Sequence, residues 1–246
     1  HNADPSRTYD MSINHLSALT QEEFASTYLT LKTNAKPLTL EQEKDTFLGD
    51  IDWTTTGAVT PIKDQGQCGS CWAFSTTGAL EALSKVGYGT LLSFSEQQLM
   101  DCSTSYGNKG CDGGLMNNAF KYVKERGIVI ESEYPYTAVK GICTKDGGNF
   151  RIAGFLDAIG CTALANALII RPISVAVDAT NWHLYSSGVF SDCANSLNHG
   201  VLLVGSSTDS WKVKNSWSAK WGENGYIRLA RGSTCGICTI PSYPLK

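Results

Sequence analysis

The sequence has no long apolar run, no excess of basic charge and no Asn-x-Ser/Thr site for N-linked glycosylation. No stretch reaches the roughly 18 apolar residues that a membrane-spanning helix needs. Its 20 basic and 23 acidic residues give a net charge of −3, which offers no basic patch to a nucleic acid. We therefore expect neither a membrane nor a nucleic acid as a partner. The first residues also lack a signal-peptide pattern, so we expect any targeting segment to be absent from this chain.

Histidine is scarce and cysteine is abundant, with four and nine residues respectively. Nine cysteines are many for a cytosolic protein, and setting one aside leaves an even number for disulfides. This count predicts disulfides plus one free thiol, in a chain that matures in an oxidising compartment. A chain of 246 residues is long enough for one large domain, or for two small ones that share a face.

A glycine-rich turn, QGQCGSCW at residues 65–72, precedes a regular helical pattern. From Cys71 to Val86 the apolar residues return at steps of three and four, as on one face of a helix. A cysteine at a helix N-terminus lies beside unpaired N–H groups and the positive end of the helix dipole, which favour the thiolate. Cys71 is therefore predicted to be a nucleophile.

The pattern changes from helical to strand-rich along the chain. Residues 20–24 read as a capped helix start, and a second helix follows Ser95, with Gln98 completing a capping box. A third helix is predicted near Leu115–Glu125, ended by Gly127. After about residue 152 come short runs typical of strands: Ile173–Val177, Val201–Val204, Trp211–Val213 and Tyr226–Leu229. This order predicts an α+β protein with two lobes and a cleft between them.

The few histidines limit the choice of a base for the thiol. Two lie within the first 15 residues, and His183 lies among aromatic residues, where a structural role is expected. His199 opens an apolar strand 128 residues after Cys71, and Asn215 stands 144 residues after it. The partners of a catalytic cysteine of this type are expected roughly 130–150 residues downstream. The spacing predicts His199 as the acid and base, and Asn215 as the residue that orients its ring.

Together these blocks resemble the papain-like cysteine proteases, and the cathepsin L-like branch in particular. The motif at 65–72, the strand after His199 and the Asn-Ser-Trp at 215–217 carry the resemblance, supported by residues 101–103, 110–114 and 134–136. It implies a papain-like fold with a helical left lobe and a β-barrel-like right lobe, and a cysteine endopeptidase that forms a thioacyl-enzyme on Cys71. It also implies Gln65 as an oxyanion-hole donor and Trp217 as a cover over the His199–Asn215 contact. Neither a cofactor nor a metal is implied.

The resemblance also implies a substrate-binding set, which comprises Gly113, Gly114, Leu115, Met116, Ala176, Leu197, Asn198, Gly200, Trp217 and Ile240. The apolar Ile240 at the base of the pocket predicts a preference for apolar side chains at the substrate residue two before the cut. The disulfides that the family implies are Cys68–Cys111, Cys102–Cys143 and Cys193–Cys235. Cys161 and Cys238 are left over, either as a fourth bridge or as two buried thiols.

Residues 1–47 resemble a truncated prosegment, and residues 48–246 the catalytic domain. Within that domain we expect a helical lobe at about 58–155 and a strand-rich lobe at about 156–246, and residues after Thr33 read as a linker. In this family the prosegment runs through the cleft in reverse to the substrate. Ala18 stands where the family motif is acidic, so a carboxylate that could sense pH is missing there. We therefore expect a zymogen whose prosegment is a weak inhibitor, trimmed toward Leu48.

The same cysteines allow other interpretations. Cys68-x-x-Cys71 and Cys235-x-x-Cys238 could be two zinc knuckles, but the pairs are much farther apart than in a zinc ribbon. The first pair could be a thioredoxin-like redox site, but no short βαβ unit surrounds it. An inactive family member that only binds peptides is the third alternative, and the intact catalytic set argues against it.

Three residues depart from the family pattern. Asn198 stands where most members have Asp before the catalytic histidine, and Ser206 and Ser218 replace common glycines. These changes put rate and pH range in question rather than reaction type. The expected partners are polypeptide substrates, the chain's own prosegment and cystatin-like inhibitors. We expect a monomer in a lysosome-like acidic compartment or secreted.

Overall fold

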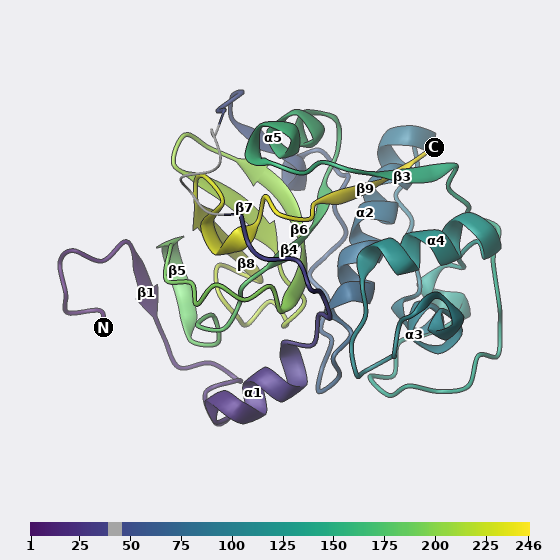
Figure 1. Ribbon diagram of the computed structural model, residues 1–246, viewed down its shortest axis with the longest axis horizontal. Helices are drawn as coiled ribbons and strands as arrows, with labels where there is room; N and C mark the ends of the chain where they lie inside the picture. The colour runs from purple at the N-terminus through teal and green to yellow at the C-terminus, as the bar shows by residue number, and fades with distance from the viewer. Residues whose placement is uncertain (39–45) are drawn as a thin grey trace.

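The computed structural model describes residues 1–38 and 46–246, and Figure 1 shows helices gathered beside a twisted sheet. The α-helices are α1 (Gln21–Tyr28), α2 (Cys71–Tyr88), α3 (Glu96–Cys102), α4 (Met116–Arg126) and α5 (Cys161–Ile170). The strands are β1 (Tyr9–Met11), β2 (Ile51–Asp52), β3 (Gly154–Asp157), β4 (Ile173–Val177), β5 (Tyr185–Phe190), β6 (His199–Ser206), β7 (Ser210–Lys214), β8 (Tyr226–Ala230) and β9 (Ser242–Leu245). The predicted α+β class is confirmed.

The strands join in one sheet path in the order β1-β5-β8-β7-β6-β4-β9-β3, and β2 also pairs with β6. Only the pairing of β5 with β8 is parallel among these described strands. All eight residues of β6 are buried, as are all five of β4. Strands covered on both faces read as continuous apolar runs, which explains why the sequence marked these two strands clearly.

Three predicted helices are confirmed with small changes at their ends. Helix α2 begins at Cys71 and runs two residues past the predicted end, to a left-handed Gly89. Helix α3 is capped by Ser95, which accepts from the Gln98 N–H. The Gln98 side chain does not complete the expected capping box, because it bonds instead to the backbone of Val129 and of a neighbouring loop. Helix α4 ends before Gly127, as expected.

The sequence pattern missed five strands and one helix of the described structure. Strands β1, β2, β3, β5 and β9, and helix α5, were not predicted. Most of these strands have few buried apolar residues, so they form through pairing with neighbours rather than through a local pattern. Part of the expected linker, residues 39–45, lies outside the described residues.

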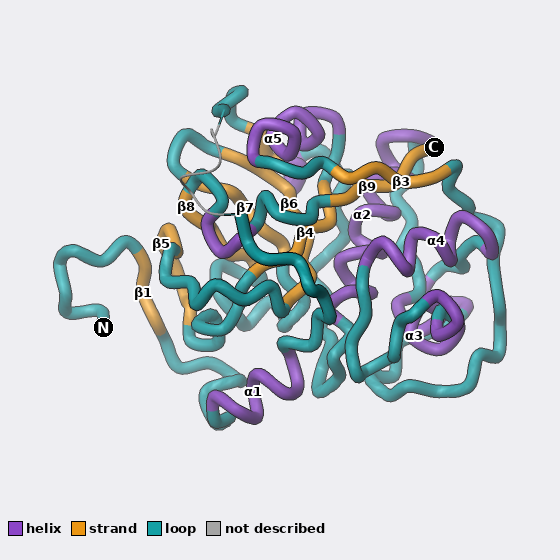
Figure 2. Tube along the Cα trace, viewed as in Figure 1, coloured by secondary structure: helices purple, strands orange, loops and turns teal. Residues whose placement is uncertain are grey.

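The apolar interior consists of two clusters, and alternate residues of β4 and β6 contribute to each of them. The strand-rich lobe has a core built from α5, β4, β6, β7 and β8, and the helical lobe has a core built from α2, α3 and α4. Helix α2 crosses the sheet at Ser75. The Ser75 hydroxyl donates to the Val201 carbonyl at 2.7 Å, and the Ser75 carbonyl accepts from the Ser174 hydroxyl at 2.8 Å. In the tube of Figure 2, α2 lies beside β4 and β6. The N-termini of α2 and β6 therefore meet between the lobes.

Four disulfides fasten the loops around these cores. The three expected pairs, Cys68–Cys111, Cys102–Cys143 and Cys193–Cys235, are present. The alternative left open by the sequence is resolved, because Cys161 at the start of α5 is bonded to Cys238. Among the described residues Cys71 alone is a free cysteine. Since Cys68, Cys235 and Cys238 are all in disulfides, the zinc and redox interpretations lose their ligands.

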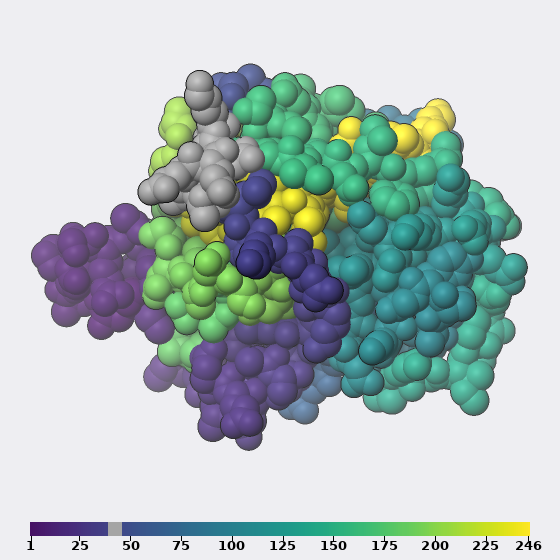
Figure 3. Space-filling model, viewed as in Figure 1, coloured from purple at the N-terminus to yellow at the C-terminus, as the bar shows by residue number. Residues whose placement is uncertain are grey.

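Residues 1–38, which we call the N-terminal segment, lie on the surface of both lobes. Strand β1 pairs with β5, and α1 begins with a complete capping box between Thr20 and Glu23. Figure 3 shows the segment crossing the face of the molecule along the boundary between the green strand-rich lobe and the teal helical lobe. Across the described parts of the chain, no helix combines the length and apolar character of a membrane span.

Candidate active site

Cys71 is buried at the first position of α2, directly after the turn that the sequence marked. The start of β6 packs against it. A Cβ built on Gly200 would lie 3.3 Å from the Trp72 Cα and 3.4 Å from the Cys71 carbonyl oxygen. Only a glycine allows this approach without displacement, and it brings the preceding residue, His199, to the same place.

The His199 ring is fixed by the two residues that the sequence predicted. Its Nε2 donates to Asn215 Oδ1 at 2.8 Å, and Asn215 Oδ1 also accepts from the Ser216 N–H at 2.8 Å. The indole of Trp217 covers this contact, with its centroid 4.7 Å from the imidazole. Because Nε2 carries the proton toward Asn215, Nδ1 is the nitrogen left for the thiol, and it has no hydrogen-bond partner among the described residues.

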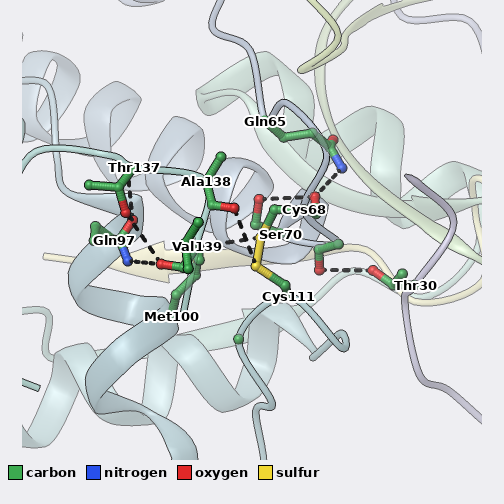
Figure 4. Close-up of a disulfide and its surroundings, with 12 residues drawn as sticks. Thr30, Gln65, Cys68, Ser70, Gln97, Met100, Cys111, Thr137, Ala138 and Val139 are labelled. Carbon is green, nitrogen blue, oxygen red and sulfur yellow. Dashed lines mark hydrogen bonds between the residues drawn. A yellow bond between two sulfur atoms is a disulfide. The ribbon is translucent and has the colours of Figure 1, made fainter. Parts of the chain in front are cut away.

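Gln65 is fully buried beside the same turn. Its Nε2 donates to the Cys68 carbonyl at 2.9 Å, which Figure 4 shows, and its Oε1 accepts from Ser216 Oγ at 2.7 Å. These two bonds orient the side-chain amide, and one N–H of its –NH₂ group remains. That remaining donor is the group an oxyanion hole needs.

The N-terminal segment covers this site. Thr30 Oγ1 donates to the Gly69 carbonyl at 2.8 Å, also visible in Figure 4, and the Leu31 N–H donates to the Asn198 carbonyl at 3.0 Å. A Cβ on Gly113 would lie only 2.0 Å from the Thr30 carbonyl oxygen. The segment therefore passes directly over Cys71 and against Gly113.

Burial shifts the pKa of Cys71 and the pKa of His199 in the directions that disfavour their charged forms. Burial raises the pKa of the Cys71 thiol, and it lowers the pKa of His199 to about 4. The Asn215 hydrogen bond and the Tyr28 backbone act in the opposite direction on His199 but do not overcome burial. In the covered state burial therefore opposes the charged form of each group.

Several of the other predicted substrate-binding residues belong to the same apolar cluster as Leu31 of the segment. Leu31 is buried in one apolar cluster with Met116, Ala176 and Leu197, and Leu115 and Ile240 border it, half-buried. A side chain at Gly114 would point to a different place from one at Gly113. A Cβ there would meet the Trp72 ring at 2.8 Å and Asn108 Oδ1 at 2.6 Å, so its missing side chain faces the core.

The Asn198 side chain points away from the reacting groups. Its Oδ1 accepts from the Ala179 N–H at 3.0 Å and its Nδ2 donates to Thr180 Oγ1 at 2.9 Å. Asn198 therefore fixes the 179–180 loop with its side chain while its carbonyl faces the segment. Because residue 198 is Asn and not the usual Asp, neither of these two hydrogen bonds involves a charged group.

The sequence reasoning missed an ionic cluster beneath the site. Lys63 Nζ lies 2.6 Å from both Glu81 Oε1 on α2 and Glu96 Oε1 on α3. Lys214 Nζ donates to the Thr60 carbonyl at 2.8 Å, and Thr60 Oγ1 donates to Glu81 Oε2 at 2.6 Å. The cluster thus connects the helical lobe to the strand that leads into the Asn-Ser-Trp motif.

Burial shifts the titration of this cluster. It raises the pKa of Glu96 to about 7 and lowers the pKa of Lys214 to about 8. A small cavity of about 20 Å³ lies among Lys63, Glu81, Lys214 and Asn215. In the sequence, the signal that could have revealed this ionic cluster was Lys214. This lysine follows an apolar residue at the end of a strand and directly precedes Asn215.

His183, which the sequence analysis set aside, lies apart from this catalytic set in the loop before β5. Its ring is half-buried under Phe24 of α1, with the two centroids 5.2 Å apart. Metal binding has little support in the described residues, where the group of suitable side chains found is Cys102, Cys143 and Asp146. Two of these are joined in a disulfide and cannot act as thiolates.

Comparisons with known proteins agree with this arrangement. The profile of the papain family cysteine proteases matches residues 49–245. The chain is 46% identical to cathepsin L 2 of Paramecium tetraurelia, over 98% of this chain and 79% of that protein. It is 43% identical to a cathepsin L-like proteinase of Fasciola hepatica, over 97% and 79% respectively. The structure of digestive procathepsin L 3 from Tenebrio molitor larval midgut superposes with a TM-score of 0.87 at 42% identity, covering 98% of this chain and 84% of that one. The chain therefore belongs to the papain family of cysteine proteases and is a papain-like cysteine endopeptidase related to cathepsin L.

Proposed function

We propose that the chain hydrolyses peptide bonds through a thioester on Cys71. The sulfur attacks the carbonyl carbon, the C–N bond breaks, and His199 gives its proton to the leaving amine. A water molecule then hydrolyses the thioester with His199 as the base, which releases the acyl product and restores the thiol. The observation that carries this proposal is a free cysteine at the start of α2, beside the strand that begins with His199 and its Asn215 contact.

Gln65 and the Cys71 backbone N–H would stabilise the oxyanion that forms during each step. The side-chain amide of Gln65 is already held by Cys68 and Ser216, so it needs no rearrangement. Removal of one such donor in other enzymes lowers turnover by roughly 10²–10³. We expect a similar loss for Gln65→Ala.

The proton moves from sulfur to imidazole when the N-terminal segment leaves. With the segment in place, burial opposes both charged forms, as the directions of the Cys71 and His199 pKa shifts indicate. Departure of the segment admits water and removes much of that penalty. The thiolate–imidazolium pair then becomes accessible, helped by the α2 dipole at Cys71.

Substrates with apolar side chains two residues before the cut would be preferred. The proposed pocket is lined by the cluster that now holds Leu31, which includes Met116 and Ala176, with Ile240 at its edge. Each methylene that fills such a pocket contributes on the order of 1–3 kcal/mol to discrimination. An arginine would lose hydration with no carboxylate at Ile240 to compensate.

Residues 1–47 would act as an inhibitory prosegment of the catalytic domain, residues 48–246. Its hold is proposed to be weak and reversible, because its described residues form no core of their own. Leu16, Phe24 and Tyr28 instead join the core of the strand-rich lobe. The lobes of the domain would divide at about residue 155. We further propose a monomer that acts on polypeptides in a lysosome-like acidic compartment or after secretion, and that cystatin-like inhibitors bind.

The test of this function is cleavage of a dipeptidyl fluorogenic substrate by the full chain and by Cys71→Ala. The full chain should release the fluorophore after incubation at acidic pH, and Cys71→Ala should release none while its circular dichroism spectrum is unchanged. Residual turnover by Cys71→Ala, with contaminating protease excluded, would refute the assignment of the nucleophile.

A further inference from the structure

The Tyr-Pro-Tyr motif at residues 134–136 contacts the turn that precedes Cys71, although the reaction proposed above gives it no role. The Tyr136 hydroxyl donates to the Gln65 carbonyl at 2.7 Å, and its oxygen lies 2.6 Å from Ser70 Oγ. Gln65 begins the turn, and Ser70 is its last residue before α2. One phenol is therefore bonded to both ends of the turn.

The proton count fixes the direction of these two hydrogen bonds. A carbonyl oxygen only accepts, so the single phenol proton is directed to Gln65, and the phenol oxygen accepts from the Ser70 hydroxyl. Burial raises the pKa of Tyr136, so the phenol keeps its proton. The neutral phenol thus serves both ends of the turn at once.

Ser70 stands at the N-cap of α2 but does not cap the helix. A serine hydroxyl at this position usually accepts from an N–H of the first helical turn. The Ser70 backbone has φ −102° and ψ 13°, outside the extended region, and its side chain makes no cap bond. The hydroxyl is bonded to Tyr136 instead, so it holds the turn rather than the helix.

Tyr136 is itself fixed by the helical lobe. Its ring packs edge-on against Phe74 of α2, with the centroids 4.9 Å apart at 76°, and its N–H donates to Glu131 Oε1 at 2.8 Å. Thr30 also holds this turn, through the Gly69 carbonyl, but it belongs to the N-terminal segment. The Tyr136 contacts involve no residue of that segment, so they remain when the segment leaves.

The two oxyanion donors of the proposed reaction stand at the two ends of this turn. The Gln65 side chain is oriented by Cys68 and Ser216, whereas the Gln65 backbone is held by the phenol. The second donor, the Cys71 N–H, directly follows Ser70. Such donors stabilise charge only where it develops, and a displacement of about 1 Å can cost roughly 10²-fold in rate. The distance between the ends of the turn therefore matters for turnover.

We propose that Tyr136 is a positioning residue, which through Gln65 and Ser70 sets the relative placement of the two oxyanion donors. The inference rests on the proposed function, because it assumes that the Gln65 side chain and the Cys71 N–H bind the oxyanion. Tyr136 acts through the turn and not by contact with the reacting atoms.

The test is a double-mutant cycle of Tyr136→Phe and Gln65→Ala. Hydrolysis of a dipeptidyl fluorogenic substrate with leucine two residues before the cut gives kcat and KM. Each full-length variant is activated at acidic pH, and its active sites are titrated. The rate of Cys71 alkylation by iodoacetamide is measured in parallel. In that reaction sulfur displaces iodide and no oxyanion forms, so it reports the thiolate alone.

Tyr134→Phe is the matched control within the same motif. The Tyr134 hydroxyl donates to Asp101 Oδ2 at 2.9 Å and accepts from the Thr144 N–H at 3.2 Å, so its loss also removes one donated and one accepted bond. Neither partner belongs to the turn at 65–70. Urea unfolding of both variants compares their stabilities.

We expect Tyr136→Phe to lower kcat by about fivefold to thirtyfold, with KM and the alkylation rate within about twofold of wild type. In the Gln65→Ala background the same substitution should lower kcat by about twofold or less, because relative placement matters only while both donors are present. Tyr134→Phe should keep the kcat of wild type even where it unfolds at lower urea.

If Tyr136→Phe does not fold, Ser70→Ala takes its place in the cycle, because it removes the phenol's accepted bond without changing the lobe. Its expected loss in kcat is about threefold to tenfold. The inference is overturned by a kcat within twofold of wild type, by an equal loss with and without Gln65, or by alkylation that slows as much as hydrolysis.

In each of those cases cleavage by the wild-type enzyme shows that the proposed function stands while the role of Tyr136 fails. A wild-type chain that cleaves no peptide refutes the proposed function and this inference together.

Discussion

Phe24→Ala tests how strongly α1 holds the N-terminal segment over the active site. The Phe24 side chain is fully buried and packs against Trp217, His183 and Tyr28. Replacing a buried phenylalanine by alanine costs about 3–5 kcal/mol. Since the lost contacts join the segment to the lobe, we assign most of this cost to the docking equilibrium rather than to the fold of the lobe.

Each 1.4 kcal/mol is a factor of ten, so docking should weaken by roughly 10²–10³. The segment remains attached by β1 and by Thr30, which limits the effect to local undocking of α1 and the residues after it. At neutral pH, where wild type is expected to start slowly, Phe24→Ala should cleave a dipeptidyl substrate with a much shorter lag.

A second measurement separates docking from self-processing. In the Cys71→Ala background, which cannot cut itself, hydrogen exchange of the α1 amides reports undocking directly. Glu22→Ala is the matched control, because Glu22 is exposed on the same helix and has no side-chain contact with the lobe in the described structure. If Phe24→Ala showed the lag and the α1 protection of wild type, our account of the segment would be wrong.

Four further predictions concern stability in urea. Lys63→Met leaves Glu81 and Glu96 buried without their cation and should cost about 3–5 kcal/mol. The pKa of Glu96 is raised to about 7 in the folded protein. Its stabilising contribution is therefore complete below about pH 4.5 and is lost as the pH rises through 7. Glu96→Gln should flatten that part of the plot of unfolding free energy against pH. Ser218→Gly should stabilise by about 1 kcal/mol, because Ser218 has a φ of 67°. Replacing Cys161 and Cys238 together by alanine should lower the free energy of unfolding by about 2–4 kcal/mol. For each of these variants, an unfolding midpoint equal to that of wild type would contradict the proposed role of the residue.

The catalytic candidates could be predicted because their signals are local and chemically specific. Cys71 follows a glycine turn and begins a helix, and His199 begins a strand whose residues are all apolar or small. Such patterns depend on neighbours within a few residues. The same reasoning located β4 and the core of β6, whose burial on both faces leaves a continuous apolar run.

Elements that depend on distant partners could not be predicted in this way. Strands β1 and β2 are three and two residues long and exist through pairing with β5 and β6. The Gln98 side chain satisfies the backbone near Val129 instead of its own helix N-terminus, a choice that only the packed loop makes available. The Lys63 cluster likewise assembles from four separate parts of the chain, the loop before α2, α2, α3 and β7.

By itself the sequence determined the reacting residue types, the main helices and buried strands, and three of the disulfide pairs through family resemblance. Tertiary structure alone decided that Cys161 pairs with Cys238, that the Asn198 side chain points away from the reacting groups, and that Phe24 packs against Trp217 and His183. It also decided the direction of the pKa shifts at the covered site, since burial opposes charge on both Cys71 and His199. The physical reason is the same in each case. Propensity and periodicity act over a few neighbouring residues, whereas burial, side-chain direction and pKa depend on atoms that only the folded chain brings together.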